Sequence, residues 1–187
     1  MLRARPCLPP RGLVGGGLVV LAGLLTGAVP ARADGERAAS LAAGWAAYAV
    51  PNPDEPEQDL TSLAGAGLGA EFELALGEAF SLRADLAGAA FWGDDGASYL
   101  GLASAGGTYR FDVLRYVPYA FAGVGAVVSG GGPLDLGVSP VLVLGGGLDV
   151  LTRRERSWGV EGRLASFAGD VTVFTAGVRL THRWGFF

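Results

Sequence analysis

The feature that most constrains this chain is an alternation of apolar side chains with small or polar ones at every second residue. It is clearest from Phe80 to Trp92, where Leu82 and Leu86 fall on one face and Arg83 and Asp85 fall on the other. A repeat of two residues is the period of a β-strand, whereas a helix repeats every 3.6 residues. We find no convincing helical period beyond the N-terminal segment, so the sequence predicts an all-β fold.

Segments of this kind recur along the chain, and glycine, proline, asparagine or aspartate separates most of them. They are Ala38–Val50, Ser62–Leu76, Phe80–Trp92, Ser98–Phe111, Val117–Ser129, Val138–Leu151, Ser157–Phe167 and Val171–Phe186. An even number of strands is required of a single-chain bacterial barrel, and each segment is long enough to cross a bilayer at a tilt. We therefore expect an eight-stranded antiparallel up-and-down β-barrel.

The short connection Gly77-Glu78-Ala79 predicts the register of one hairpin. If residue 78 is its centre, Glu73 lies opposite Arg83 and Glu71 lies opposite Asp85. The first pair is favourable, whereas the second places two carboxylates side by side. Asp85 therefore needs a cation from another strand.

The two faces of the segments favour a transmembrane barrel over a soluble sandwich. One face is Leu, Val, Ala, Phe and Trp with almost no charge, and aromatic residues lie near segment ends, as they do at membrane interfaces. We assign to these interfaces Phe80, Trp92, Tyr109, Phe111, Tyr119, Trp158, Trp184 and Phe186. The opposite face is mostly Gly, Ala, Ser and Thr, whereas the polar face of a soluble sandwich would be freely charged.

Isolated charges on the more polar face are expected to point into the barrel. They are Glu71, Glu73, Arg83, Asp85, Arg110, Asp149, Glu161, Arg163, Arg179 and Arg183. One interpretation is a polar pore lining. The favoured one is an interior charged network that plugs a narrow barrel, because side chains nearly fill eight strands and unpaired charges there are costly.

The first 33 residues predict a cleaved signal peptide. Three arginines precede an uncharged, leucine-rich run over residues 12–31, which ends in the small-x-small sequence Ala31-Arg32-Ala33. Cleavage near Ala33 leaves residues 34–187 as one barrel domain. It removes the only cysteine, Cys7, and four of the 14 basic residues, so ten basic residues face 18 acidic ones and the net charge is about −8. This charge argues against a nucleic-acid partner.

Two stretches carry a resemblance to a known family. The alternating last segment, which ends in Trp184-Gly185-Phe186-Phe187, resembles the signal read by the outer-membrane barrel-assembly machinery. The stretch from Tyr116 to Gly125 is similar to a strand common in the eight-stranded porin-like outer-membrane protein superfamily. The resemblance implies the outer membrane of a Gram-negative bacterium, outer-membrane lipid as a partner, and assembly through the strand ending at Phe187. It also implies a periplasmic C-terminus, with residues 51–61, 93–97, 130–137 and 168–170 facing outward.

The leading functional hypothesis is a non-enzymatic envelope protein with a structural or surface-interaction role. The alternative is a narrow channel for small molecules, including apolar ones. A lipid-modifying enzyme would depend on His182, the sole histidine, which we interpret as an interfacial residue; a soluble periplasmic barrel that binds an apolar ligand is a further alternative. One histidine offers too few ligands for a metal site, and we expect no metal and no cofactor.

Overall fold

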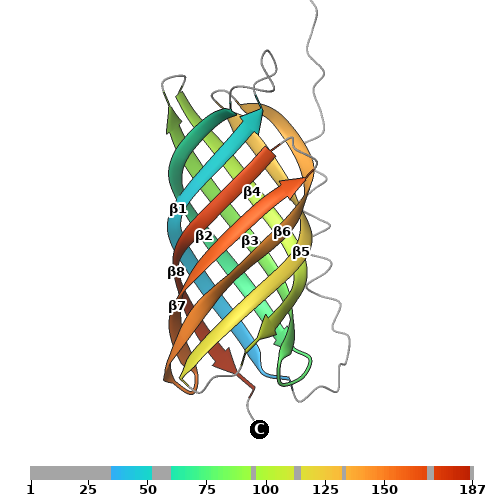
Figure 1. Ribbon diagram of the computed structural model, residues 1–187, viewed down its shortest axis with the longest axis vertical. Coiled ribbons are helices and arrows are strands. Elements are labelled where there is room, and N and C mark those ends of the chain that lie inside the picture. The colour runs from blue at the N-terminus through green and yellow to red at the C-terminus, as the bar shows by residue number, and fades with distance from the viewer. Residues whose placement is uncertain are drawn as a thin grey trace, which may run out of the picture. The chain divides into compact units, whose positions relative to one another are not determined.

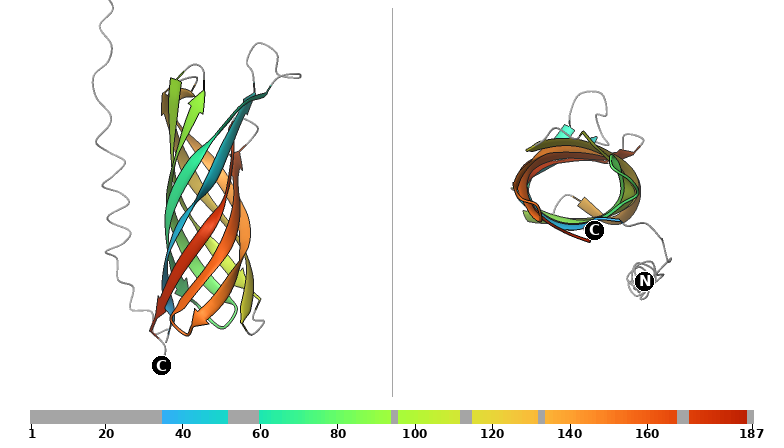
Figure 2. Two further views of the ribbon diagram at one scale, coloured as in Figure 1. Left: turned by 90° about the vertical axis from the view of Figure 1, so that its left-hand side faces the viewer. Right: turned by 90° about the horizontal axis from the view of Figure 1, so that it is seen from below.

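Eight antiparallel strands make up the barrel. The computed structural model describes residues 35–51, 60–93, 96–111, 115–131, 134–167 and 171–185. The strands are β1 (Arg37–Pro51), β2 (Leu60–Ala75), β3 (Phe80–Gly93), β4 (Gly96–Arg110), β5 (Tyr116–Gly131), β6 (Leu134–Arg153), β7 (Arg156–Phe167) and β8 (Val171–Trp184). Each strand pairs with its neighbours in sequence, and β1 also pairs with β8, so the sheet closes (Figures 1 and 2). The expected eight-stranded up-and-down barrel is confirmed.

The two ends of the barrel differ in which parts of the chain they contain. At the terminal end, β1 begins at Arg37 and β8 ends at Trp184; this end is at the bottom of Figure 1. At the loop end, β1 ends at Pro51 and β8 begins at Val171. No helix in the described ranges is long and apolar enough to cross a membrane. The expected signal peptide lies outside the described residues.

The β2–β3 hairpin has the predicted register. Glu73 is the cross-strand partner of Arg83, and Glu71 is the cross-strand partner of Asp85. Other boundaries differ by a few residues, in part because pairing continues through glycines that we had assigned to loops. For example, β4 begins at Gly96, where a φ of 110° suits the tight turn after β3, and Gly130 pairs with Tyr99.

Glycine pairs allow neighbouring strands to approach closely where the barrel closes. Gly44 of β1 lies opposite Gly177 of β8. A Cβ atom added at Gly44 would overlap the backbone of Ala176 and Gly177. The seam between the first and last strands therefore depends on small residues, in keeping with the sharp curvature of a narrow barrel.

The outer wall of the barrel is apolar. Large side chains such as Leu41, Leu68 and Leu180 are each more than half exposed on it, at 66%, 71% and 61%. Soluble monomers rarely expose a contiguous apolar surface of this kind. The inner wall is divided along the barrel axis: charged side chains occupy the half toward the terminal end, and apolar side chains occupy the half toward the loop end.

Candidate functional site in the barrel interior

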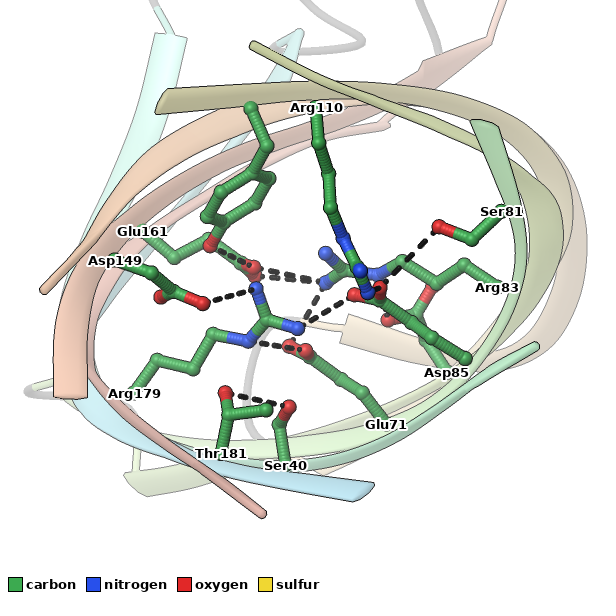
Figure 3. A network of polar contacts seen from close by, with 12 residues as sticks. Ser40, Glu71, Ser81, Arg83, Asp85, Arg110, Asp149, Glu161, Arg179 and Thr181 are labelled. Atoms are coloured by element: carbon green, nitrogen blue, oxygen red, sulfur yellow. Dashed lines mark hydrogen bonds and ion pairs between the residues drawn. The ribbon is translucent and has the colours of Figure 1, made fainter. Parts of the chain in front are cut away.

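All ten charged residues that we assigned to the interior point into the barrel. Nine of them are buried, and Arg110 is partly buried near the terminal end. They come from β2, β3, β4, β6, β7 and β8, so strands on opposite sides of the barrel meet through their side chains (Figure 3). We keep the name interior charged network for these ten residues.

Glu71 is the residue of the network with the most arginine partners. Its carboxylate lies 2.8 Å from Arg83 Nη2, 3.1 Å from Arg163 Nη2 and 2.9 Å from Arg179 Nε. These three arginines belong to β3, β7 and β8. One carboxylate from β2 therefore connects its own hairpin to the last hairpin of the barrel.

Asp85 has the additional cation that its position opposite Glu71 requires. Arg83 Nε lies 2.7 Å from Asp85 Oδ1, and Arg163 Nη2 lies 3.3 Å from the same oxygen. Ser104 of β4 donates a hydrogen bond of 3.1 Å to the other oxygen of Asp85. Arg163 thus contacts both carboxylates of the unfavourable pair, and it reaches them from β7.

The position of Tyr119 shows that one of our sequence assignments was wrong. We had placed it at the membrane interface, but it is 5% exposed and its hydroxyl donates a 2.8 Å hydrogen bond to Glu161. Glu161 also accepts from Arg83 and Arg163, each at 2.9 Å. The register of β5 explains the error, because pairing with Arg110 on the inner face of β4 turns Tyr119 inward as well.

A second group of contacts lies closer to the terminal end. Glu73 pairs with Arg179 at 2.6 Å and with Arg110. Asp149 pairs with Arg183 at 2.9 Å. Glu36, which sequence reasoning missed because it precedes the first strand, lies 3.2 Å from Arg183 and 3.5 Å from Arg110.

The network balances its charges internally. Its five arginines face five carboxylates, and Glu36 adds one more carboxylate at the terminal end. Aromatic rings supply further contacts: the Arg83 guanidinium lies 3.8 Å from the centroid of Phe121, and that of Arg179 lies 4.7 Å from the centroid of Tyr119. Buried ions need such pairing and hydrogen bonding to offset their lost hydration.

The apolar half of the interior was not predicted from the sequence. Its core belongs to a cluster of buried residues, of which Tyr119 and Phe121 extend into the charged half: Ala46, Tyr48, Phe91, Leu100, Leu102, Tyr119, Phe121, Val127, Val141, Val143, Ala165 and Val173. The rings of Tyr48 and Phe91 pack edge to face, 4.7 Å apart. A cavity of about 50 Å³ lies where this cluster meets Glu161 and Arg163, which is room for a few water molecules.

Most of the remaining aromatic residues lie on the outer wall. Phe80, Trp92, Tyr109, Phe111, Trp158 and Trp184 are all exposed there. At the terminal end the rings of Phe80 and Tyr109 are 4.9 Å apart, and those of Tyr109 and Phe111 are 4.7 Å apart. Trp92 is near the loop end of β3. Phe186 and Phe187 lie outside the described residues.

Comparison with known proteins shows which solved structures share this fold. No family model matches the sequence, and no curated protein matches it. Solved structures do match. Neisserial surface protein A has a TM-score of 0.62 at 12% identity, over 81% of this chain and 98% of that one. The chain has the fold of the small outer-membrane β-barrels.

Other outer-membrane barrels share this fold. Ail, the attachment invasion locus protein of Yersinia pestis, has a TM-score of 0.56 at 16% identity, over 80% of this chain and 99% of Ail. The outer membrane enzyme PagL has a TM-score of 0.50 at 15% identity, over 78% of this chain and 98% of PagL. The eight-stranded outer-membrane barrel therefore accommodates both an attachment invasion locus protein and an enzyme, so function must be argued from the residues.

Proposed function

We propose that this chain is a non-enzymatic outer-membrane β-barrel with a structural or surface-interaction role in the cell envelope. The apolar outer wall supports a membrane location, because large side chains such as Leu68 and Leu180 are exposed on it. In hydrocarbon every backbone amide must be paired within the protein, and a closed sheet meets that condition. The fold shared with outer-membrane barrels supports the outer membrane as the location.

The single observation that carries a non-conducting role is the occupied interior. Arg83 of β3 and Glu161 of β7, which lie four strands apart around the barrel, meet across the lumen at 2.9 Å, and both are buried. The apolar cluster fills the interior beyond them, toward the loop end. An ion on the barrel axis would have to displace paired charges and then pass an apolar layer.

Export and orientation belong to the same proposal. We propose that residues 1–33 are removed on export and that the terminal end faces the periplasm. The loops at the other end then face outward, and the segment over residues 52–59 holds four acidic residues and two prolines. Such loops are where a surface interaction would take place.

Fractionation followed by electrophoresis tests the proposal first. We expect the protein in the outer-membrane fraction, with a mature N-terminus near Asp34 and a mobility in cold detergent that changes after boiling. Purified protein in planar bilayers should then give no unitary current steps. Recovery as a soluble periplasmic protein without a heat-dependent shift would overturn the membrane location.

A second candidate function is a narrow channel for small molecules, including apolar ones. The apolar half of the interior and the adjoining cavity of about 50 Å³ favour it. Reproducible unitary steps, or uptake of a small apolar solute that depends on the protein, would favour this candidate over the sealed barrel.

The hypothesis of a lipid-modifying enzyme rests on His182. Its ring stacks on Trp184 with centroids 5.8 Å apart, and its cross-strand partners are Ala39 and Arg156. None of these three side chains is a nucleophile. We therefore expect a His182→Ala variant to leave the lipid profile of the outer membrane unchanged, and an altered profile would support an enzyme.

A further inference from the structure

The exposed arginines of the barrel are all at one end. Beyond the predicted signal peptide the chain has ten arginines, and five of them belong to the interior charged network. The other five are exposed and lie at the terminal end: Arg37, Arg115, Arg153, Arg154 and Arg156. The segments 52–59, 94–95, 132–133 and 168–170, which connect strands at the loop end, contain no arginine. Positive charge outside the barrel is thus confined to the terminal end.

Two of these arginines flank a pair of stacked rings. Arg37 of β1 is the cross-strand partner of Trp184, and Arg156 of β7 is the cross-strand partner of His182. Trp184 and His182 lie on the same outer face of β8, with their rings stacked at an interplanar angle of 24°. We call these four residues the outer cationic cluster; all four are exposed.

The positive charge of this cluster is unpaired within the described ranges of the chain. Neither Arg37 nor Arg156 forms an ion pair with any residue that the structure describes. The nearby Glu36 instead pairs with Arg110 and Arg183 of the interior. Arg153 lies opposite Arg156 in the β6–β7 hairpin and adds a further positive charge beside it.

The surface next to the cluster, toward the middle of the barrel, is apolar. Trp158 is two residues beyond Arg156 on the same face of β7, and its cross-strand partner is Leu180. Leu180 in turn pairs with Leu41 of β1. Phe72 packs against Trp184, with ring centroids 6.3 Å apart. On this outer surface the cations lie at the terminal end and the apolar rings lie nearer the middle of the barrel. This order matches that of a phospholipid, in which a phosphate is followed by acyl chains.

We propose that the outer cationic cluster binds the headgroup phosphate of an anionic phospholipid on the outside of β7, β8 and β1. Strands are spaced about 4.8 Å apart and rise about 3.3 Å per residue, so Arg37 and Arg156, on either side of β8 and offset by two residues along it, start about 12 Å apart, and both guanidinium groups can reach one phosphate. His182 adds an N–H donor between them. Trp184, Trp158 and Phe72 contact the first part of the acyl chains. This inference rests on the membrane location proposed above.

Quenching of Trp184 fluorescence by brominated lipids tests the inference. Trp45, Trp92 and Trp158 are changed to Phe, which leaves Trp184 as the only reporter. The protein is inserted into phosphatidylcholine vesicles that contain equal fractions of either brominated phosphatidylglycerol or brominated phosphatidylcholine. We expect Trp184 to prefer phosphatidylglycerol at least about fivefold, because a single arginine contributes about that ratio at an anionic surface.

Charge-matched variants separate a specific site from general attraction. In the Trp184-only background, Arg37→Gln with Arg156→Gln should abolish the preference and Arg37→Gln alone should weaken it. Arg115→Gln removes the same charge at the same end but in the turn between β4 and β5, and should leave the preference unchanged. A reporter that retains only Trp92, near the loop end, should show no preference for phosphatidylglycerol.

The possible outcomes distinguish this inference from the proposed function. If Trp184 is quenched equally by both lipids, or if Arg115→Gln lowers the preference as much as Arg37→Gln does, the specific site is overturned while the membrane barrel stands. If neither brominated lipid quenches Trp184, the protein is not in the bilayer, and both proposals fail.

Discussion

Glu71 and Asp85 are direct cross-strand partners in the β2–β3 hairpin, so two buried carboxylates face each other inside the barrel. Within the hairpin, Arg83 contacts both of them. One arginine between two carboxylates leaves a net negative charge, and Arg163 supplies the second cation from β7. The hairpin is therefore electrostatically complete only when β7 is in place.

Replacing Arg163 should destabilise the barrel strongly. Arg163→Met removes a cation from Glu71, Asp85 and Glu161 at once, and breaking a buried pair in this way costs about 3–5 kcal/mol. Urea unfolding in lipid vesicles measures the loss. Adding Glu71→Gln removes one uncompensated charge and should recover about 1 kcal/mol or more. A loss below about 1 kcal/mol for Arg163→Met alone would contradict the assigned role.

Removing the Tyr119 hydroxyl should lower stability by about 1.5–3 kcal/mol, because its hydrogen bond goes to the buried carboxylate of Glu161. Tyr119→Phe keeps the ring beneath Arg179 and removes only the donor. The matched control is Tyr116→Phe, at an exposed position on the same strand, which should change the unfolding free energy by less than about 0.5 kcal/mol. Equal effects of the two changes would show that the hydrogen bond from Tyr119 to Glu161 does not stabilise the barrel.

A single methyl group at the closing seam should weaken the barrel. Gly44→Ala places a Cβ atom against the backbone of β8, which we expect to cost about 1–3 kcal/mol and to lower the temperature at which the heat-dependent gel shift occurs. Gly101→Ala is the control, since nothing lies within 4 Å of a Cβ atom at that outward position. The control should be neutral or slightly stabilising, by up to about 1 kcal/mol. Equal effects of Gly44→Ala and Gly101→Ala on stability would show that the closing seam has room for a Cβ atom.

Truncating Phe91 tests the apolar half of the interior. Its ring is fully buried against Tyr48, so Phe91→Ala should cost about 3–5 kcal/mol. Leu86→Ala, on the outer face of the same strand, should cost less than half as much, because lipid can fill the space. The charged network remains in the Phe91 variant, so we expect no unitary current from it. A conducting Phe91→Ala barrel would show that the apolar cluster, and not the network, closes the interior.

Strand positions, the β2–β3 register and the inward charges could all be predicted because each depends on local alternation. The partners of those charges could not. Arg83 meets Glu161 across the lumen, from strands that are not neighbours, and only closure of the sheet brings them together. Tyr119 was misplaced because β5 carries aromatic and apolar residues on both faces, so its pattern does not say which face is inside.

The apolar half escaped prediction for a similar reason. In β4, Leu100 and Leu102 point inward, while small residues such as Gly101 and Ala103 lie on the outer face. Alternation is present there, but both faces lack charge. The sequence then indicates a strand without indicating which of its faces points into the barrel.

The contacts of Glu71 across the lumen constrain how the chain can assemble. Its three arginine partners include two that come from the last two strands. A nascent sheet that contained only the first six strands would carry uncompensated carboxylates, which hydrocarbon does not accept at low cost. Insertion strand by strand is therefore disfavoured, and the chain is expected to enter the bilayer in one concerted event, once its final hairpin has joined the rest.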